Sequence, residues 1–125
     1  MLLIIEDNPD LVALYRAAMK LIQVEPEVEV TGPAALRRIT NSDSEIPRAV
    51  ILDLHLKKEG DMEVTGRELF TTIRANWPAT RIIVVSADIV WCSHFYGVAD
   101  AVVEKPIADM GEFLGLIRGF VGGAA

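Results

Sequence analysis

The sequence predicts an α/β protein in which helices cover both faces of a doubly wound, five-stranded parallel sheet. Short apolar runs alternate with longer stretches of helical periodicity, and five such pairs follow one another. Four of the five runs are rich in Ile, Val or Leu, which is typical of strands buried on both faces. The expected strands are residues 2–5, 27–31, 49–52, 81–85 and 101–104.

A helix is expected after each strand. The first begins at Asn8 and Pro9, a good N-cap followed by a residue favoured at the first helical position, and the third is capped by Thr65 and ends before Pro78. Residues 33–39 form a short second helix, and residues 89–97 show only weak periodicity. The inward-facing side chains are expected to be Leu11, Leu14, Tyr15, Ala18, Met19 and Ile22 in the first helix, Leu69, Phe70 and Ile73 in the third, and Met110, Phe113, Leu114, Ile117, Phe120 and Val121 in the fifth.

The composition indicates one cytoplasmic domain over residues 1–125, with no output domain. Of the 125 residues, 51% are apolar and 24% are charged, which is enough for one buried core. The net charge of −6 disfavours direct binding to nucleic acid or to anionic membranes. A single cysteine, Cys92, excludes an internal disulfide, and no apolar run approaches the roughly 20 residues that cross a bilayer.

Carboxylates follow two strands that are expected to meet at the point where the strand order reverses. Glu6 and Asp7 follow the first strand, and Asp53 follows the third. Ligands of doubly wound sheets bind beyond the carboxyl ends of the strands at this point. Three anions repel one another unless a cation joins them, and oxygen ligands suit Mg²⁺. A carboxylate beside Mg²⁺ can attack a phosphoryl group and form an acyl phosphate.

Two further residues end strands at the same edge of the predicted sheet. Ser86 follows the fourth strand, and Lys105, which precedes Pro106, follows the fifth. A hydroxyl and an ammonium can each pair with a phosphoryl oxygen, as in other phosphoryl-transfer sites.

Four segments, in this order, closely resemble the motifs of the response-regulator receiver family: Ile4-Ile5-Glu6-Asp7-Asn8, Val50-Ile51-Leu52-Asp53-Leu54, Val84-Val85-Ser86-Ala87 and Val103-Glu104-Lys105-Pro106. The resemblance implies a flavodoxin-like sheet with strand order 2-1-3-4-5, as in the chemotaxis regulator. It implies that Asp53 is the phosphoacceptor and that Mg²⁺ is bound by Glu6, Asp7, Asp53 and the backbone carbonyl of His55. Ser86 would be the switch hydroxyl and Lys105 the phosphate-sensing lysine.

The same resemblance implies a role in two-component or phosphorelay signal transduction. The phosphoryl donor would be a histidine kinase or a histidine phosphotransfer protein, and the output would be contacts with a downstream protein that the sequence does not identify. Such a domain is not an enzyme acting on other substrates, since it catalyses only its own phosphoryl transfer and dephosphorylation. A homodimer is an additional possibility.

The chain departs from the family pattern in three places. Lys57 stands where the family usually has proline, and residues 57–63 resemble an insertion that brings Lys57 and Lys58 near a site expecting a metal. Val102 replaces the aromatic switch residue. The spacing from Ser86 to Lys105 is short, so the fourth helix is expected to be short or irregular.

Two alternative functions follow from these departures and from the aspartates. The first is a divergent receiver that binds a partner without being phosphorylated. The second is a haloacid-dehalogenase-like phosphatase, but that family requires two aspartates one residue apart, and neither Glu6-Asp7-Asn8 nor Asp53-Leu54-His55 supplies them. Dinucleotide binding is excluded because no glycine-rich turn follows the first strand.

The remaining notable residues are interpreted as structural. The side chains of His55 and His94 lack a second His or Cys at ligand spacing, and Cys92 is a small core residue. For Trp91, Phe95 and Tyr96, packing on the sheet is favoured over a partner-binding patch. Three glycines at every fourth position of the last helix would allow close approach of the sheet or a dimer partner: Gly111, Gly115 and Gly119.

Overall fold

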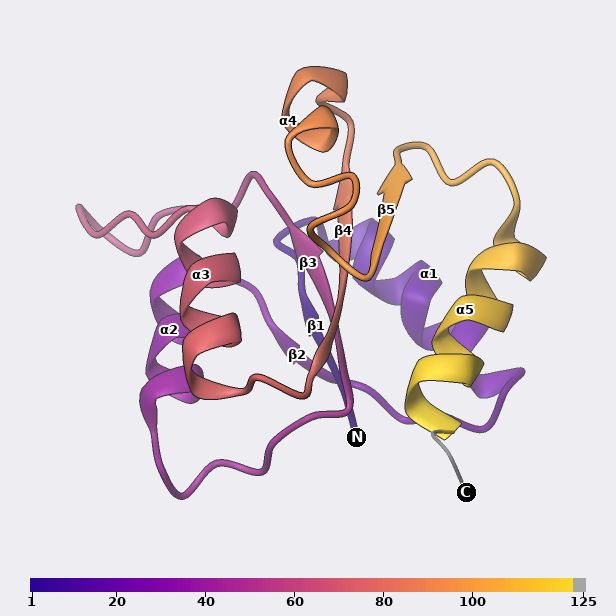
Figure 1. Cartoon of the computed structure of the whole chain (residues 1–125), viewed down its shortest axis with the longest axis horizontal. Coiled ribbons are helices and arrows are strands. Elements are labelled where there is room, and N and C mark those ends of the chain that lie inside the picture. Colours follow the sequence, from indigo (N-terminus) through magenta and orange to yellow (C-terminus); the bar gives the residue numbers. More distant parts are fainter. Residues whose placement is uncertain (123–125) are drawn as a thin grey trace.

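The computed structural model describes residues 1–122 as five alternating pairs of strand and helix around a parallel sheet (Figure 1). The sheet has the order β2-β1-β3-β4-β5, and all four neighbouring pairs are parallel. Both the α/β class and the strand order agree with the prediction. The strands are β1 (Leu2–Ile5), β2 (Glu27–Glu29), β3 (Ala49–Asp53), β4 (Arg81–Ser86) and β5 (Ala101–Glu104).

Helices cover both faces of the sheet, as predicted: α2 and α3 lie on one side and α1 and α5 on the other (Figure 1). Their bounds are α1 (Pro9–Lys20), α2 (Gly32–Thr40), α3 (Gly66–Asn76), α4 (Ile89–Ser93) and α5 (Met110–Gly122). Leu3 and Leu52 pack in the core under α2 and α3, whereas Ile4 and Ile51 pack in the core under α1 and α5. Alternate residues of β1 and β3 therefore enter opposite cores, which explains their continuous apolar runs.

Side-chain caps fix the starts of two helices that follow the central strands. Asn8 Oδ1 accepts hydrogen bonds from the N–H groups of Asp10 (2.9 Å) and Leu11 (3.2 Å). Thr65 and Glu68 form a capping box, in which each side chain accepts a hydrogen bond from the backbone N–H of the other. Both predicted helix starts are confirmed. The caps fix the direction of the chain where it leaves β1 and where it enters α3.

Several element boundaries differ from those that the sequence predicts. The second strand ends at Glu29, because Thr31 instead caps α2 by accepting the Ala34 N–H at 3.1 Å. The fourth helix is only five residues long. Leu14 does not face inward, since the residue is 49% exposed. Ile22 lies beyond the end of α1 but packs against the core, as predicted.

The residues that were interpreted as structural from the sequence differ in how deeply they are buried. Cys92 and Phe95 are buried, whereas His94 is exposed and Tyr96 does not pack into the core. A Cβ added to Gly115 or Gly119 would have no heavy atom within 4 Å apart from its chain neighbours and the nearby backbone of α5 itself. The expected close approach of α5 to the sheet through these glycines is therefore wrong. In residues 1–122, no helix is long and apolar enough to span a membrane.

The turn that follows α1 contains a residue in an unfavourable left-handed backbone conformation, and we expect Gln23→Gly to raise the free energy of unfolding by about 0.5–1 kcal/mol. Gln23 has φ 58°. The N–H groups of Val24 and Gln23 donate to the carbonyls of Met19 (3.0 Å) and Lys20 (3.2 Å), which are the two bonds of a Schellman motif. Urea denaturation measures the gain. Gln23→Ala keeps the Cβ and serves as the control, so an equal gain in both variants would contradict this explanation.

Candidate functional site

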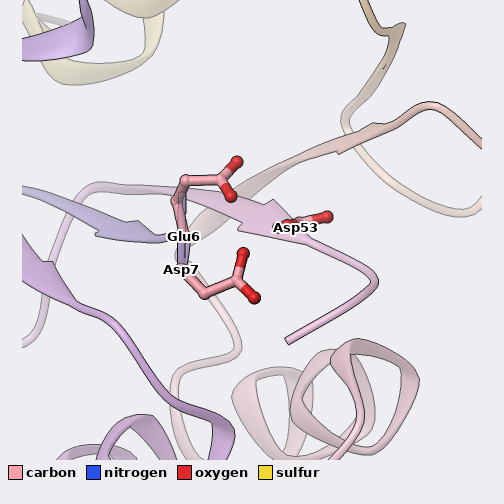
Figure 2. Close-up of side chains that lie close together, drawn as sticks. All are labelled: Glu6, Asp7 and Asp53. Carbon is pink, nitrogen blue, oxygen red and sulfur yellow. The ribbon is translucent and has the colours of Figure 1, made fainter. Parts of the chain in front are cut away.

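Three carboxylates gather at the carboxyl ends of β1 and β3 (Figure 2). Glu6, Asp7 and Asp53 each offer an oxygen, and these oxygens all lie within 4.8 Å of one another. The pairing of Ile5 with Leu52 places the two strand ends side by side. Glu6 is 1% exposed and Asp53 is 5% exposed, so little water compensates their charges. The sequence-predicted acidic residues are thus brought together.

Lys105 reaches this acidic cluster from the end of β5. Its Nζ lies 2.8 Å from Glu6 Oε1 and 3.4 Å from Asp53 Oδ2. Its backbone N–H donates to the carbonyl of Ser86 at 2.9 Å, which fixes the chain where it leaves β5. The ammonium therefore bridges two buried carboxylates that come from different strands.

Burial and mutual repulsion make this cluster electrostatically unfavourable without additional positive charge. Burial raises the pKa of Glu6, and the neighbouring Asp53 adds to this rise, while the hydrogen bond from Lys105 opposes it. Burial and Glu6 likewise raise the pKa of Asp7. Desolvation alone would lower the pKa of Lys105, but its contacts with Glu6 and Asp53 raise it above the ordinary value. The single ammonium offsets only part of the cost of burying the carboxylates.

Ser86 lies at the same edge of the sheet, at the end of β4. The pairing of Asp53 with Val85 places it one residue beyond the level of Asp53. Its side chain is buried, and Oγ accepts a hydrogen bond from the Asp88 N–H at 3.1 Å. Because Oγ acts as the acceptor in this bond, the hydroxyl hydrogen remains available to donate.

His55 contacts the site through its backbone and also takes part in a side-chain contact that the sequence did not predict. Its N–H donates to Asp53 Oδ1 at 3.2 Å. The exposed imidazole places Nε2 3.6 Å from Oδ2 of Asp88, and Asp88 Oδ1 caps α4 by accepting the Trp91 N–H at 3.1 Å. Asp88 could have been identified from the sequence by its position, because it stands two residues after Ser86 and directly before the expected helix of residues 89–97. The metal-binding role of the His55 carbonyl stays a prediction.

Val102, which stands where the family that the sequence resembles has an aromatic residue, is half-buried and packs against the core beneath α3. Aromatic contacts near this region come instead from α4 and the turn that follows it. The ring centroids of Phe95 and Phe70 are 4.9 Å apart, and the Arg67 guanidinium lies 4.0 Å from the Trp91 ring centroid. Trp91 of α4 and Phe95 of the turn that follows it thus both contact side chains of α3.

The donor set of the acidic cluster fits a small, hard divalent cation. All three side chains supply carboxylate oxygens, and Mg²⁺ is typically bound in proteins by one or two carboxylates together with water and phosphate oxygens. The raised pKa values of Glu6 and Asp7 point the same way, since a cation would remove the repulsion that causes part of them.

Comparison with known proteins identifies the fold. No protein-family model and no curated protein sequence matches this chain. Among solved structures, the signal receiver domain of a candidate Luxo repressor protein from Vibrio parahaemolyticus is 25% identical, with a TM-score of 0.73 over 94% of this chain and 85% of that one. A CheY-like response regulator receiver domain from Methanospirillum hungatei is 22% identical, with a TM-score of 0.74 over 94% of this chain and 89% of that one.

A third similar structure contains a metal. The receiver domain of a sensor histidine kinase from Pseudomonas aeruginosa has a magnesium ion coordinated in its active-site cleft, and it is 19% identical with a TM-score of 0.76 over 98% of this chain and 97% of that one. Together these likenesses show that the chain has the receiver-domain fold of response regulators.

Proposed function

We propose that this chain is a phosphoacceptor receiver domain of a two-component or phosphorelay pathway, and that Asp53 accepts the phosphoryl group. The observation that carries the proposal is the Asp53 carboxylate, which is buried at the carboxyl edge of the sheet between two further carboxylates and the Lys105 ammonium. This arrangement supplies a nucleophile, oxygen ligands for a metal and a cation for a phosphoryl oxygen.

Glu6, Asp7, Asp53 and the backbone carbonyl of His55 would hold Mg²⁺. When bound, the ion neutralises charge on the phosphoryl oxygens. One oxygen of Asp53 would attack phosphorus, and the bond from phosphorus to the donor imidazole would break with its electron pair staying on nitrogen. The aspartyl phosphate would form, and the imidazole would leave neutral because its other nitrogen carries the proton. Lys105 would pair with one phosphoryl oxygen, and the Ser86 hydroxyl, whose hydrogen is free, would donate to another.

The phosphoryl donor would be a histidine kinase or a histidine phosphotransfer protein, and the output would pass through protein–protein contacts. In this role the chain acts as a signalling module that promotes only its own phosphorylation and dephosphorylation. The prediction of a single receiver domain over residues 1–125 without an output domain stays a prediction, as does a homodimer.

Incubation with acetyl phosphate tests the proposal, because this small donor requires no cognate kinase. Intact-mass spectrometry is expected to show one added phosphoryl group on the parent protein with Mg²⁺ and none when the metal is chelated. Asp53→Asn is expected to gain none, and Asp61→Asn, which removes an exposed carboxylate from a neighbouring loop, is expected to react like the parent.

The replacement of the aromatic switch by Val102 favours a second candidate, a receiver that binds a partner without phosphorylation. This candidate predicts the opposite result in the same experiment: Mg²⁺ binds, yet neither acetyl phosphate nor a panel of histidine kinases adds mass to the parent. Equal phosphorylation of the parent and Asp53→Asn would contradict both candidates.

A further inference from the structure

The loop of residues 57–63, which resembled an insertion in the sequence, is anchored to α2 through its N-cap Thr31 and through Arg37. Glu59 Oε2 accepts a hydrogen bond from Thr31 Oγ1 at 2.9 Å, and both Glu59 oxygens lie 3.0 Å from NH2 of Arg37. The backbones of Glu59 and Met62 exchange hydrogen bonds of 2.9 and 3.0 Å around Gly60, whose φ is 61°. The loop thus has a defined place, although all of its residues are exposed.

This anchoring brings Lys57 toward the acidic cluster. Lys57 forms a parallel bridge with Thr31, which stands two residues beyond the end of β2. The end of β2 is in turn joined to the acidic cluster, because the Glu6 N–H donates to the Glu29 carbonyl at 3.1 Å. Lys57 therefore belongs to the rim of the site on the β2 side, opposite Lys105, which enters from β5.

The register of the sheet agrees with this placement. Ile5 pairs with Glu29, and Asp7 and Thr31, the bridge partner of Lys57, each stand two residues beyond that pair. The adjacent Lys58 differs, since its Nζ lies 3.8 Å from Glu63 Oε2 within the loop itself. The two neighbouring lysines thus have different surroundings.

We propose that Lys57 tunes the affinity of the metal site: its positive charge on the β2 side makes the acidic cluster bind divalent cations more weakly than its three carboxylates otherwise would. Glu59 is a positioning residue that holds the loop carrying Lys57 against Thr31 and Arg37. This inference rests on the proposed function, because it assumes that the cluster binds Mg²⁺.

Titration with MgCl2, followed by the backbone amide shifts of Asp7 and His55, tests the charge of Lys57. Lys57→Gln is expected to bind Mg²⁺ about fivefold more tightly. This is the size of effect for removing one positive charge several ångströms from a divalent ion in a largely aqueous setting. Lys58→Gln makes the same change in net charge and is expected to alter the dissociation constant by less than about twofold, since its charge is already paired and exposed. Lys57→Arg should behave like the parent.

High salt provides a further check, because screening should reduce the difference between Lys57→Gln and the parent. The role of Glu59 is tested by the double variant Glu59→Ala with Arg37→Ala, which leaves the net charge unchanged. This variant is expected to bind Mg²⁺ more tightly than the parent, with a similar thermal midpoint, because a released loop no longer keeps Lys57 on the β2 side of the acidic cluster. An unchanged Mg²⁺ affinity would overturn the positioning role.

The outcomes separate this inference from the proposed function. If the parent shows no amide shifts with Mg²⁺, the proposed function itself fails. If the parent binds Mg²⁺ but Lys57→Gln and Lys58→Gln change the dissociation constant equally, only the inference about Lys57 is overturned. The same holds if Lys57→Arg binds as tightly as Lys57→Gln.

Discussion

Replacing Gly66 by alanine is expected to lower the free energy of unfolding by about 3 kcal/mol, the upper range for forcing extra atoms into a packed site. A Cβ on Gly66 would stand 2.5 Å from both the carbonyl oxygen of Asp53 and the Cα of Leu54. Both are backbone atoms, so no side-chain rotation relieves the overlap. Either α3 must move away from the sheet or the end of β3 must shift, and a shift of β3 displaces the Asp53 carboxylate.

Urea denaturation and the Mg²⁺ titration together measure this effect. We expect Gly66→Ala to lose both stability and Mg²⁺ affinity. Gly115→Ala is the matched control, because the same substitution on α5 meets no atom within 4 Å and should stabilise the helix by about 1 kcal/mol. If Gly66→Ala has the stability and the Mg²⁺ affinity of the parent, the close approach of Gly66 to the backbone of Asp53 and Leu54 does not restrict this position to glycine.

Replacing Lys105 by methionine is expected to destabilise the metal-free protein by about 2 kcal/mol, since removing one partner leaves buried carboxylates uncompensated. The Lys105 side chain is 20% exposed and that of Glu6 only 2%, so solvent screens this ion pair only in part. The pKa of Lys105 is raised, so its stabilising effect is complete at neutral pH and is lost only as the pH rises above the ordinary value of 10.5.

Mg²⁺ distinguishes this electrostatic role of Lys105 from simple packing. A divalent ion supplies the missing positive charge, so the stability difference between the parent and Lys105→Met should shrink when Mg²⁺ is added before thermal or urea unfolding. Lys58→Met, at a side chain that is 61% exposed, should change stability by less than about 0.5 kcal/mol. A deficit in Lys105→Met that stays constant with and without Mg²⁺ would argue for packing alone.

The sequence was sufficient to predict the sheet and the gathering of the acidic residues, for one physical reason. Strands buried on both faces have continuous apolar runs, and the carboxyl ends of parallel strands meet at one edge of the sheet. The residues that directly follow these runs, such as Glu6, Asp53 and Lys105, are therefore neighbours wherever the strand order holds.

Features that depend on contacts between loops were not predictable. Thr31 is β-branched, a residue type favoured in strands, but its hydroxyl caps α2 and donates a hydrogen bond to Glu59. The contact of His55 with Asp88 likewise joins two loops whose relative position no periodicity encodes. Exposure of Leu14 at a helical apolar position shows that periodicity predicts a face of the helix and does not determine how much of it the sheet covers.

The bridge between Lys105 and Glu6 has a consequence for the order in which this protein matures. It joins residues that are 99 positions apart, so the acidic cluster acquires the Lys105 ammonium only after residue 105 has been synthesised and β5 has joined the sheet. A nascent chain that stops before β5 has the carboxylates at the end of β1 without their counterion. Under the function that we propose, Lys105 would be available for phosphoryl transfer only in a chain that extends past β5.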